Sequence, residues 1–147
     1  MPLKLFSALL LFIFLALTGC QRGPRIVPVS GVITLDGRPV EGAAVMYMLI
    51  PGGRIATGVT DAQGRYTLST HPSGNGAYEG THSVTVSLYR DESSPGTNTP
   101  EGAVSGSSLV KIVWLVPERY SKPQESGLLT TVKAGEKSIY DFNLKSE

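Results

Sequence analysis

The sequence predicts an all-β fold, a β-sandwich of about seven short strands, and three observations lead to it. Apolar and polar residues alternate with a period of two in several segments, as they do along strands with one buried face. The 17 glycines and 10 prolines are spread along the chain, where they favour tight turns. Beyond the apolar N-terminus, no segment shows a helical period of useful length.

The first strand and its turn are the clearest elements. Residues 29–35 alternate, with one face formed by Val29, Gly31, Ile33 and Leu35. Asp36-Gly37 follows, and this dipeptide favours a type I′ hairpin turn because both central residues of that turn need positive φ. Residues 43–50 are apolar on both faces, which predicts a central strand covered on both sides.

Strands and turns alternate again in the middle of the chain. Short strands are predicted at residues 55–60 and 65–70, the second with Tyr66 and Leu68 inward. Between them, the Asp61 side chain is expected to accept hydrogen bonds from the backbone N–H groups just ahead of it. Gly64 is expected to take the left-handed conformation that returns the chain into the next strand. Residues 71–80 are predicted to form a loop.

The second half of the domain completes the strand pattern. In residues 81–89, Val84, Val86 and Leu88 are predicted to face inward, and Ser83, Thr85 and Ser87 outward. Residues 91–108 have almost no large apolar side chain, so we expect a mobile loop there. The apolar residues 109–116 predict a strand containing Trp114, and residues 117–127 a connection containing Tyr120. Strands at 128–133 and 138–144 close the domain.

The N-terminus contains the single cysteine of the chain, Cys20. Residues 5–17 are almost wholly apolar, but this run is shorter than the roughly 20 residues that span a bilayer. Thr18 and Gly19 are small residues of the kind that a signal peptidase accepts. This arrangement resembles the lipobox of bacterial lipoproteins. The resemblance implies cleavage between Gly19 and Cys20 and acylation of Cys20. An ordinary cysteine behind a cleaved secretory signal is the alternative.

The lipobox resemblance implies that the mature chain is anchored to a membrane. Two or three acyl chains on Cys20 would hold it firmly, because each buried methylene contributes about 0.8 kcal/mol. Residues 1–19 are then a signal peptide, residues 20–28 the lipidated cysteine and a tether, and residues 29–147 the domain. Gln21 lies where an Asp commonly retains Gram-negative lipoproteins at the inner membrane, so the resemblance favours the outer membrane, at its periplasmic face or the cell surface.

The distribution of charge argues against nucleic acid as a partner. The sequence has 13 basic and 12 acidic residues. Lys4 is the only charged residue of the predicted signal peptide, so the mature chain is left with equal numbers of both signs. No cluster of Lys and Arg runs along it, whereas nucleic-acid-binding domains carry a basic patch.

Three segments in order resemble the carboxypeptidase regulatory-like domain, a transthyretin-like β-sandwich with immunoglobulin-like architecture. They are residues 32–43, 58–66 and 80–86. Residues 116–120, 126–128 and 140–144 are similar to the endings of small lipoproteins of this type from planctomycete-like bacteria. The resemblance covers nearly the whole mature chain. It implies a protein that is not an enzyme, because such domains often accompany peptidases without being catalytic.

No constellation of residues predicts catalysis, a metal or another cofactor. A zinc carboxypeptidase needs two histidines and a glutamate as ligands. His71 and His82 are the only histidines, and neither belongs to an HxxE or HExxH motif, so we expect both to be solvated polar residues. Asp36, Asp61 and Glu79 are alternative calcium ligands, although no Asp-x-Asp-x-Asp series occurs. Ser105 and Ser107 lie in no Gly-x-Ser-x-Gly motif.

Two main functional hypotheses follow. The first is a non-enzymatic, lipid-anchored envelope protein with a structural or adhesive module, whose strand edges pair with envelope proteins. The second is a carbohydrate- or peptide-binding module in which Tyr78 and Tyr120 contact the ligand, while Trp114 packs in the core. A hydrolase of the transthyretin-related type is a third hypothesis. Its Tyr-Arg-Gly-Ser ending is absent, because this chain ends in Leu-Lys-Ser-Glu.

Overall fold

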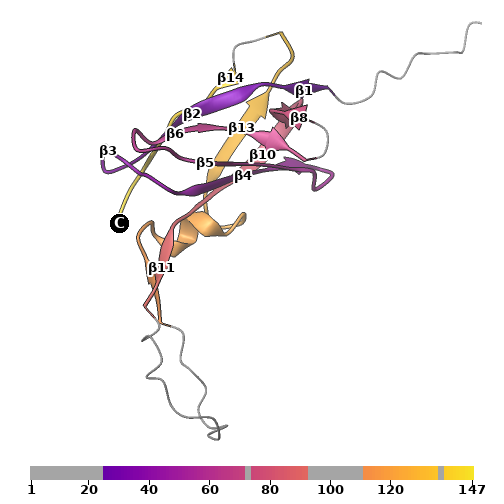
Figure 1. The fold of residues 1–147 in the computed structure, drawn as a ribbon. Helices are drawn as coiled ribbons and strands as arrows, with labels where there is room; N and C mark the ends of the chain where they lie inside the picture. The colour runs from indigo at the N-terminus through magenta and orange to yellow at the C-terminus, as the bar shows by residue number, and fades with distance from the viewer. Residues whose placement is uncertain (1–24, 72–73, 93–110, 136–137) are drawn as a thin grey trace, which may run out of the picture.

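The computed structural model describes residues 25–71, 74–92, 111–135 and 138–147. They form an all-β, sandwich-like fold in which two sheets lie face to face (Figure 1). The larger sheet is antiparallel throughout. Its strands, in spatial order, are β13 (Leu128–Val132), β10 (Gly80–Ser87), β4 (Ala44–Ile50), β5 (Ile55–Val59), β7 (Ser69–Thr70) and β8 (Gly74–Asn75).

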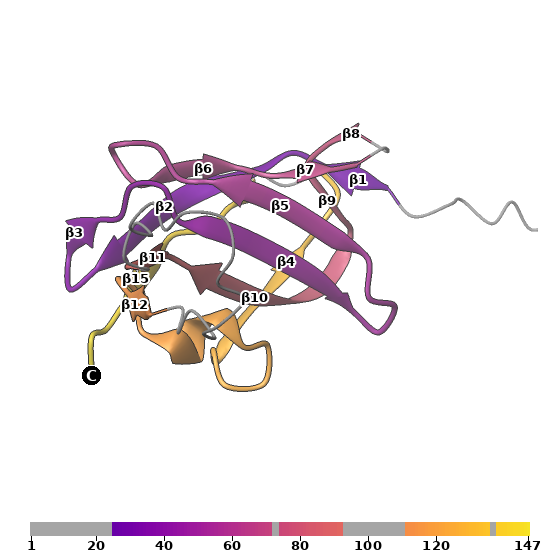
Figure 2. The same ribbon diagram turned by 60° about the horizontal axis from the view of Figure 1, so that its bottom comes forward.

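The smaller sheet is built around β2 (Val29–Leu35). β2 pairs antiparallel with β3 (Arg38–Pro39) and β6 (Arg65–Thr67), and parallel with β14 (Ser138–Ile139) and β15 (Phe142–Leu144). Two further pairs stand apart: β1 (Ile26–Val27) with β9 (Ala77–Tyr78), and β11 (Tyr89–Asp91) with β12 (Ile112–Trp114). A short 3₁₀ helix, η1 (Glu118–Ser121), precedes β13 (Figure 2).

The core lies between the two sheets and follows the predicted alternation. Val29, Gly31 and Ile33 of β2 are buried, whereas Leu35 is half-buried. Opposite them, β4 buries Val45 and Tyr47, and β10 buries Val84 and Val86. Tyr66 and Leu68 also face inward as predicted. The hydrophobic pattern therefore identified the core-facing residues of the main strands.

The predicted turns are confirmed. Asp36 and Gly37 have φ values of 50° and 80°, and the residues on either side pair, with Leu35 opposite Arg38. Asp61 Oδ1 accepts the backbone N–H groups of Gln63 at 2.9 Å and Arg65 at 2.8 Å. Gly64 has a φ of 73°. These residues shape the chain between strands.

Several predicted boundaries are wrong. The domain begins before Val29, because β1 pairs with β9 and buries Val27, so the predicted tether ends earlier. The predicted loop at 71–80 contains β8 and β9. The predicted strand at 65–70 is two strands, since the chain passes at Leu68 from the smaller sheet to the larger one. Of the predicted loop at 91–108, only Asp91 and Glu92 are described, and Asp91 ends β11; residues 93–108 lie outside the described residues.

One face of β10 is more buried than its alternation predicts. Ser83 and Thr85 were expected to face solvent, but both are buried. The connection containing η1 covers this side of β10, and the Ser83 hydroxyl donates to the carbonyl of Pro123 at 3.1 Å. A short polar side chain can be buried here because the covering loop supplies its hydrogen-bond acceptor.

The backbone of Tyr140 approaches β2 closely at the point where the parallel pairing of β14 and β15 with β2 is interrupted. β14 pairs with β2 at Val29–Ser30 and β15 at Ile33–Leu35, so Tyr140 and Asp141 lie between the two paired stretches. Asp141 Oδ1 accepts the N–H of Val32 at 2.8 Å. The Tyr140 carbonyl oxygen lies 1.8 Å from the place where a Cβ on Gly31 would stand. Only glycine fits at position 31.

Candidate functional site

Cys20 and Gly19, the predicted lipidation and cleavage residues, lie outside the described residues. The described chain starts at Arg25 and enters β1 directly. Within the described residues, no helix has the length and apolarity needed to cross a membrane. The anchor therefore stays a prediction from the sequence.

A buried cluster of tyrosines crosses the core. The hydroxyl groups of Tyr47 and Tyr66 are 2.8 Å apart, and the Tyr66 hydroxyl donates to the Tyr140 carbonyl at 2.7 Å. Because a carbonyl only accepts, the Tyr66 proton goes to Tyr140, and Tyr47 must donate to Tyr66. Burial raises the pKa of Tyr47 and of Tyr66 above the ordinary range. Both therefore stay neutral, and the cluster serves packing and hydrogen bonding.

His82 joins this cluster, contrary to the prediction that it is solvated. It shares the inward face of β10 with Val84 and Val86, and only 1% of its surface is exposed. Its ring lies 5.7 Å from that of Tyr47, and Nδ1 donates to the Gly80 carbonyl at 3.0 Å. Burial lowers the pKa of His82. His82 is a neutral core residue.

The burial of His82 predicts acid sensitivity. A histidine whose folded-state pKa is lowered favours folding above its unfolded pKa of about 6.5, and this contribution falls as the pH drops below that value. The unfolding free energy should decrease by up to about 1.4 kcal/mol per pH unit below pH 6.5 because of this residue. Denaturant titrations between pH 7 and pH 5 measure it. His82→Gln should flatten the slope and His71→Gln, on an exposed residue, should not; equal slopes in all three chains would contradict the assignment.

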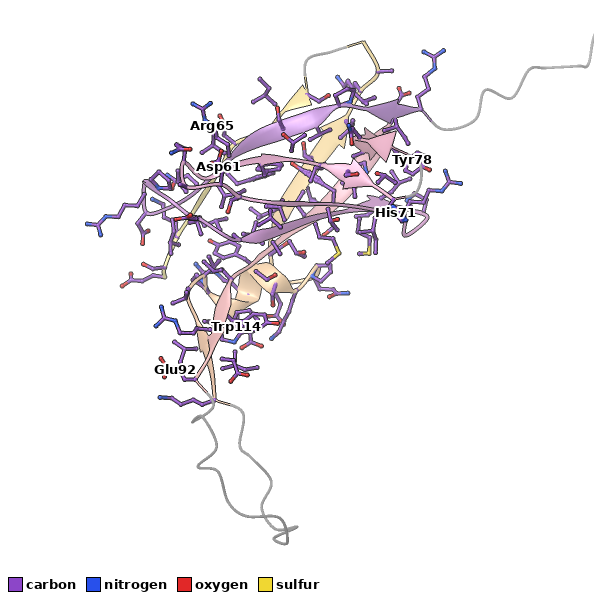
Figure 3. The ribbon with its side chains drawn as sticks, viewed as in Figure 1. Asp61, Arg65, His71, Tyr78, Glu92 and Trp114 are labelled. Atoms are coloured by element: carbon purple, nitrogen blue, oxygen red, sulfur yellow. The ribbon has the colours of Figure 1, made fainter. Side chains whose placement is uncertain are left out.

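The two predicted ligand-contact tyrosines have different environments and different places. Tyr120 in η1 is only 8% exposed, and its hydroxyl accepts the N–H of Lys145 at 3.0 Å. Burial removes it as a stacking platform. Tyr78 in β9 is half-buried, with the Arg54 guanidinium 4.7 Å from its ring centre. Tyr78 lies near His71 at one end of the body, whereas η1 lies below the larger sheet (Figures 1 and 3). The structure does not bring the two rings together.

The candidate metal ligands are likewise dispersed. Asp36 lies in the β2–β3 turn, where hydrogen bonding from Ser146 lowers its pKa, while the Asp61 carboxylate is occupied by its own turn. Glu79 lies between β9 and β10. Among the described residues, no three His, Cys, Asp or Glu side chains gather as a metal site would require.

A shallow groove of about 360 Å³ crosses the smaller sheet. It is lined by residues of β2, β6 and the β14–β15 segment, among them Ser30, Val32, Arg65, Thr67, Ile139 and Asp141. Figure 3 shows Arg65 beside Asp61 at the end of β6. The groove combines the charges of Arg65 and Asp141 with the hydroxyl groups of Ser30 and Thr67, a set able to hydrogen-bond a polar ligand. Tyr66 also lines it, but its hydroxyl is bonded to Tyr47 and Tyr140.

Three exposed large apolar residues, Tyr89, Ile112 and Leu115, lie on or beside β11 and β12, which we call the ribbon (residues 89–92 and 111–115). The rings of Tyr89 and Trp114 meet edge to face at 5.4 Å, and Tyr89 is 55% exposed. Ile112 is 49% and Leu115 41% exposed. Trp114 was predicted to be a core residue, but it lies on the ribbon, outside the core cluster (Figure 3).

The ribbon projects from the body at the end opposite β1, where the described chain begins (Figures 1 and 2). β11 and β12 pair with each other and with no other described strand. A two-stranded ribbon is marginal in water by itself. This one is held at its base by the bonds from the Leu115 and Val116 N–H groups to the Leu88 carbonyl. The exposed Tyr89 ring and the half-buried Trp114 ring give this arm an apolar surface, and such surfaces mark candidate interaction sites.

The sequence contained one signal for the ribbon that the strand prediction missed. The polar, Gly- and Ser-rich residues 93–108 lie between the short apolar segments that contain Tyr89 and Trp114. Two short segments on either side of such an insertion are placed to pair with each other as a hairpin. Comparison with known proteins adds no further assignment. No protein-family model, no curated protein and no solved structure matches this chain.

Proposed function

We propose that this chain is a non-enzymatic, lipid-anchored protein of the bacterial cell envelope, with a structural or adhesive β-sandwich that presents the ribbon to a protein partner. The observation that carries the proposal is the opposed placement of β1 and the ribbon (Figures 1 and 2). Only residues 21–25 separate Cys20 from β1. Five residues reach at most about 18 Å, so an anchor on Cys20 would keep the β1 end near the membrane and the ribbon away from it.

The chemistry of the ribbon supports a protein rather than a sugar as partner. The rings of Tyr89 and Trp114 are inclined at 65°, so they form a corner and offer no common flat platform for a sugar ring. Ile112 and Leu115 beside them cannot hydrogen-bond hydroxyl groups. An extended protein segment can use both the apolar side chains and the free main-chain groups of a strand edge.

The anchor is tested by replacing the cysteine in the full-length chain. Cys20→Ser should abolish incorporation of labelled fatty acid and leave an uncleaved precursor, because the acylated sulfur is lost. Metabolic labelling followed by electrophoresis measures both effects. Gln21→Ser is the matched control and should label and mature normally. A Cys20→Ser chain that still labels and matures would refute the lipoprotein assignment.

The groove on the smaller sheet favours a second candidate, a carbohydrate- or peptide-binding module. Its hydroxyl groups and its opposite charges, Arg65 and Asp141, suit a small polar ligand rather than an apolar protein segment. A screen of glycans and short peptides by calorimetry tests this function. A ligand whose affinity is lost in Arg65→Ala and kept in Arg38→Ala, an exposed arginine outside the groove, would support it.

A further inference from the structure

The hydrogen bonds of the ribbon determine which main-chain groups point outward. The Glu92 N–H bonds the Lys111 carbonyl at 2.8 Å, and the Leu115 N–H bonds the Leu88 carbonyl at 2.9 Å. Bonded and non-bonded pairs alternate in an antiparallel ladder. The Arg90–Val113 pair between them is therefore bonded within the ribbon. Tyr89, Asp91, Ile112 and Trp114 instead direct their N–H and C=O groups outward, at the two edges.

The outer edge of β12 is complementary to itself. If two β12 strands pair antiparallel about Val113, Ile112 of one chain lies opposite Trp114 of the other, twice. These are the residues with outward main-chain groups, so both pairs can form the two bonds of a hydrogen-bonded pair. Each also joins a β-branched and an aromatic side chain on one face, a favourable cross-strand combination. Lys111 lies opposite Leu115, and no like charges meet.

The edge of β11 lacks this complementarity. The same pairing about Arg90 sets two guanidinium groups directly opposite each other, and like charges across a strand pair are unfavourable. It also places Tyr89 opposite Asp91. Free edges are usually blunted by charge, and Arg90 and Asp91 do this on β11, whereas Ile112, Val113 and Trp114 leave β12 apolar.

We infer that the partner of the ribbon is a second copy of this chain, joined through the two β12 edges into a four-stranded antiparallel sheet. This inference rests on the proposed adhesive function and names its partner. Antiparallel pairing places the two bodies at opposite ends of the joined ribbons. β1 lies at the end of each body away from the ribbon (Figure 2), so chains anchored through Cys20 would carry their anchors on opposite sides of the contact. The contact therefore suits chains held on two facing surfaces.

Disulfide trapping in the full-length, membrane-bound chain tests the pairing. Val113 is on the two-fold axis in a non-bonded pair, where the Cα atoms are about 4.5 Å apart, within the roughly 4.4–6.8 Å that a disulfide needs. Val113→Cys should give a severalfold larger share of dimer on non-reducing gels after mild oxidation than Arg90→Cys, the control directly across the ribbon. Equal shares, or no dimer from Val113→Cys, would overturn the inference.

A proline substitution distinguishes a dimer formed by β12 pairing from random cross-linking of cysteines that meet by diffusion. Ile112→Pro removes an outward N–H group and no bond of the ribbon itself, so in the Val113→Cys background it should abolish the dimer. Asp91→Pro, the equivalent change on the β11 edge, should leave the dimer; loss in both or in neither would contradict β12 pairing. The unsubstituted chain reports on the anchor separately. A dimer there means that the Cys20 thiol is free, and the trapping is then read in a Cys20→Ser background.

Discussion

Replacing Gly31 by alanine is expected to destabilise the domain by about 3 kcal/mol or more, the upper part of the range for inserting atoms into a packed interior. A methyl group at this position would lie 1.8 Å from the Tyr140 carbonyl oxygen and 2.8 Å from the Tyr66 hydroxyl. Neither neighbour can retreat easily, because the two are hydrogen-bonded to each other at 2.7 Å. Denaturant unfolding of the chain without residues 1–20 measures the loss.

Gly53→Ala is the matched control for this substitution. Gly53 has a φ of 64° and no atom within 4 Å of the position that a Cβ would take. Its replacement should cost about 1 kcal/mol through the left-handed backbone alone. A Gly31→Ala variant no less stable than Gly53→Ala would mean that the Tyr140 carbonyl does not approach β2 as described.

Tyr66→Phe is expected to produce the second-largest loss, about 2–3 kcal/mol. The change removes the donor to the Tyr140 carbonyl and the acceptor of the Tyr47 hydroxyl together. A buried polar group that loses its partner costs about 1–3 kcal/mol. Tyr47→Phe removes only the bond that Tyr47 donates and should cost about 1 kcal/mol.

The order of the two losses distinguishes this network from simple packing. Both substitutions delete one hydroxyl from a buried tyrosine, so packing alone predicts equal effects. The double variant should cost less than the two single losses added, because the two hydroxyl groups share one bond. Equal losses that add exactly as independent sites do would argue against the assigned donor direction.

The sequence predicted what depends on local chemistry. The period-two pattern placed Val29, Ile33 and Tyr66 in the core, and the preferences of Asp and Gly placed both turns. These properties depend on neighbours within a few residues of the chain. The fold class followed from the same local signals, because alternation and turn spacing already exclude a helical core.

The sequence did not predict what depends on distant segments. The sequence predicts that His82 and Ser83 are solvated polar residues of a strand. His82 is instead buried against Tyr47 on β4, and Ser83 against the loop that contains Pro123. Trp114 reads as a core residue because large aromatics are usually buried. It is only half-buried, because β12 pairs with β11 away from both sheets. The candidate site consequently moved from Tyr78 and Tyr120 to the ribbon.

The smallness of β1 has a mechanical consequence for a chain tethered at its N-terminus. Tension applied between Arg25 and the ribbon reaches the two residue pairs of β1 and β9 before it reaches β2. Those two pairs would open before the seven-pair ladder between β4 and β10, because fewer main-chain hydrogen bonds hold them. A tethered chain under load would therefore yield first at β1, before the two main sheets separate.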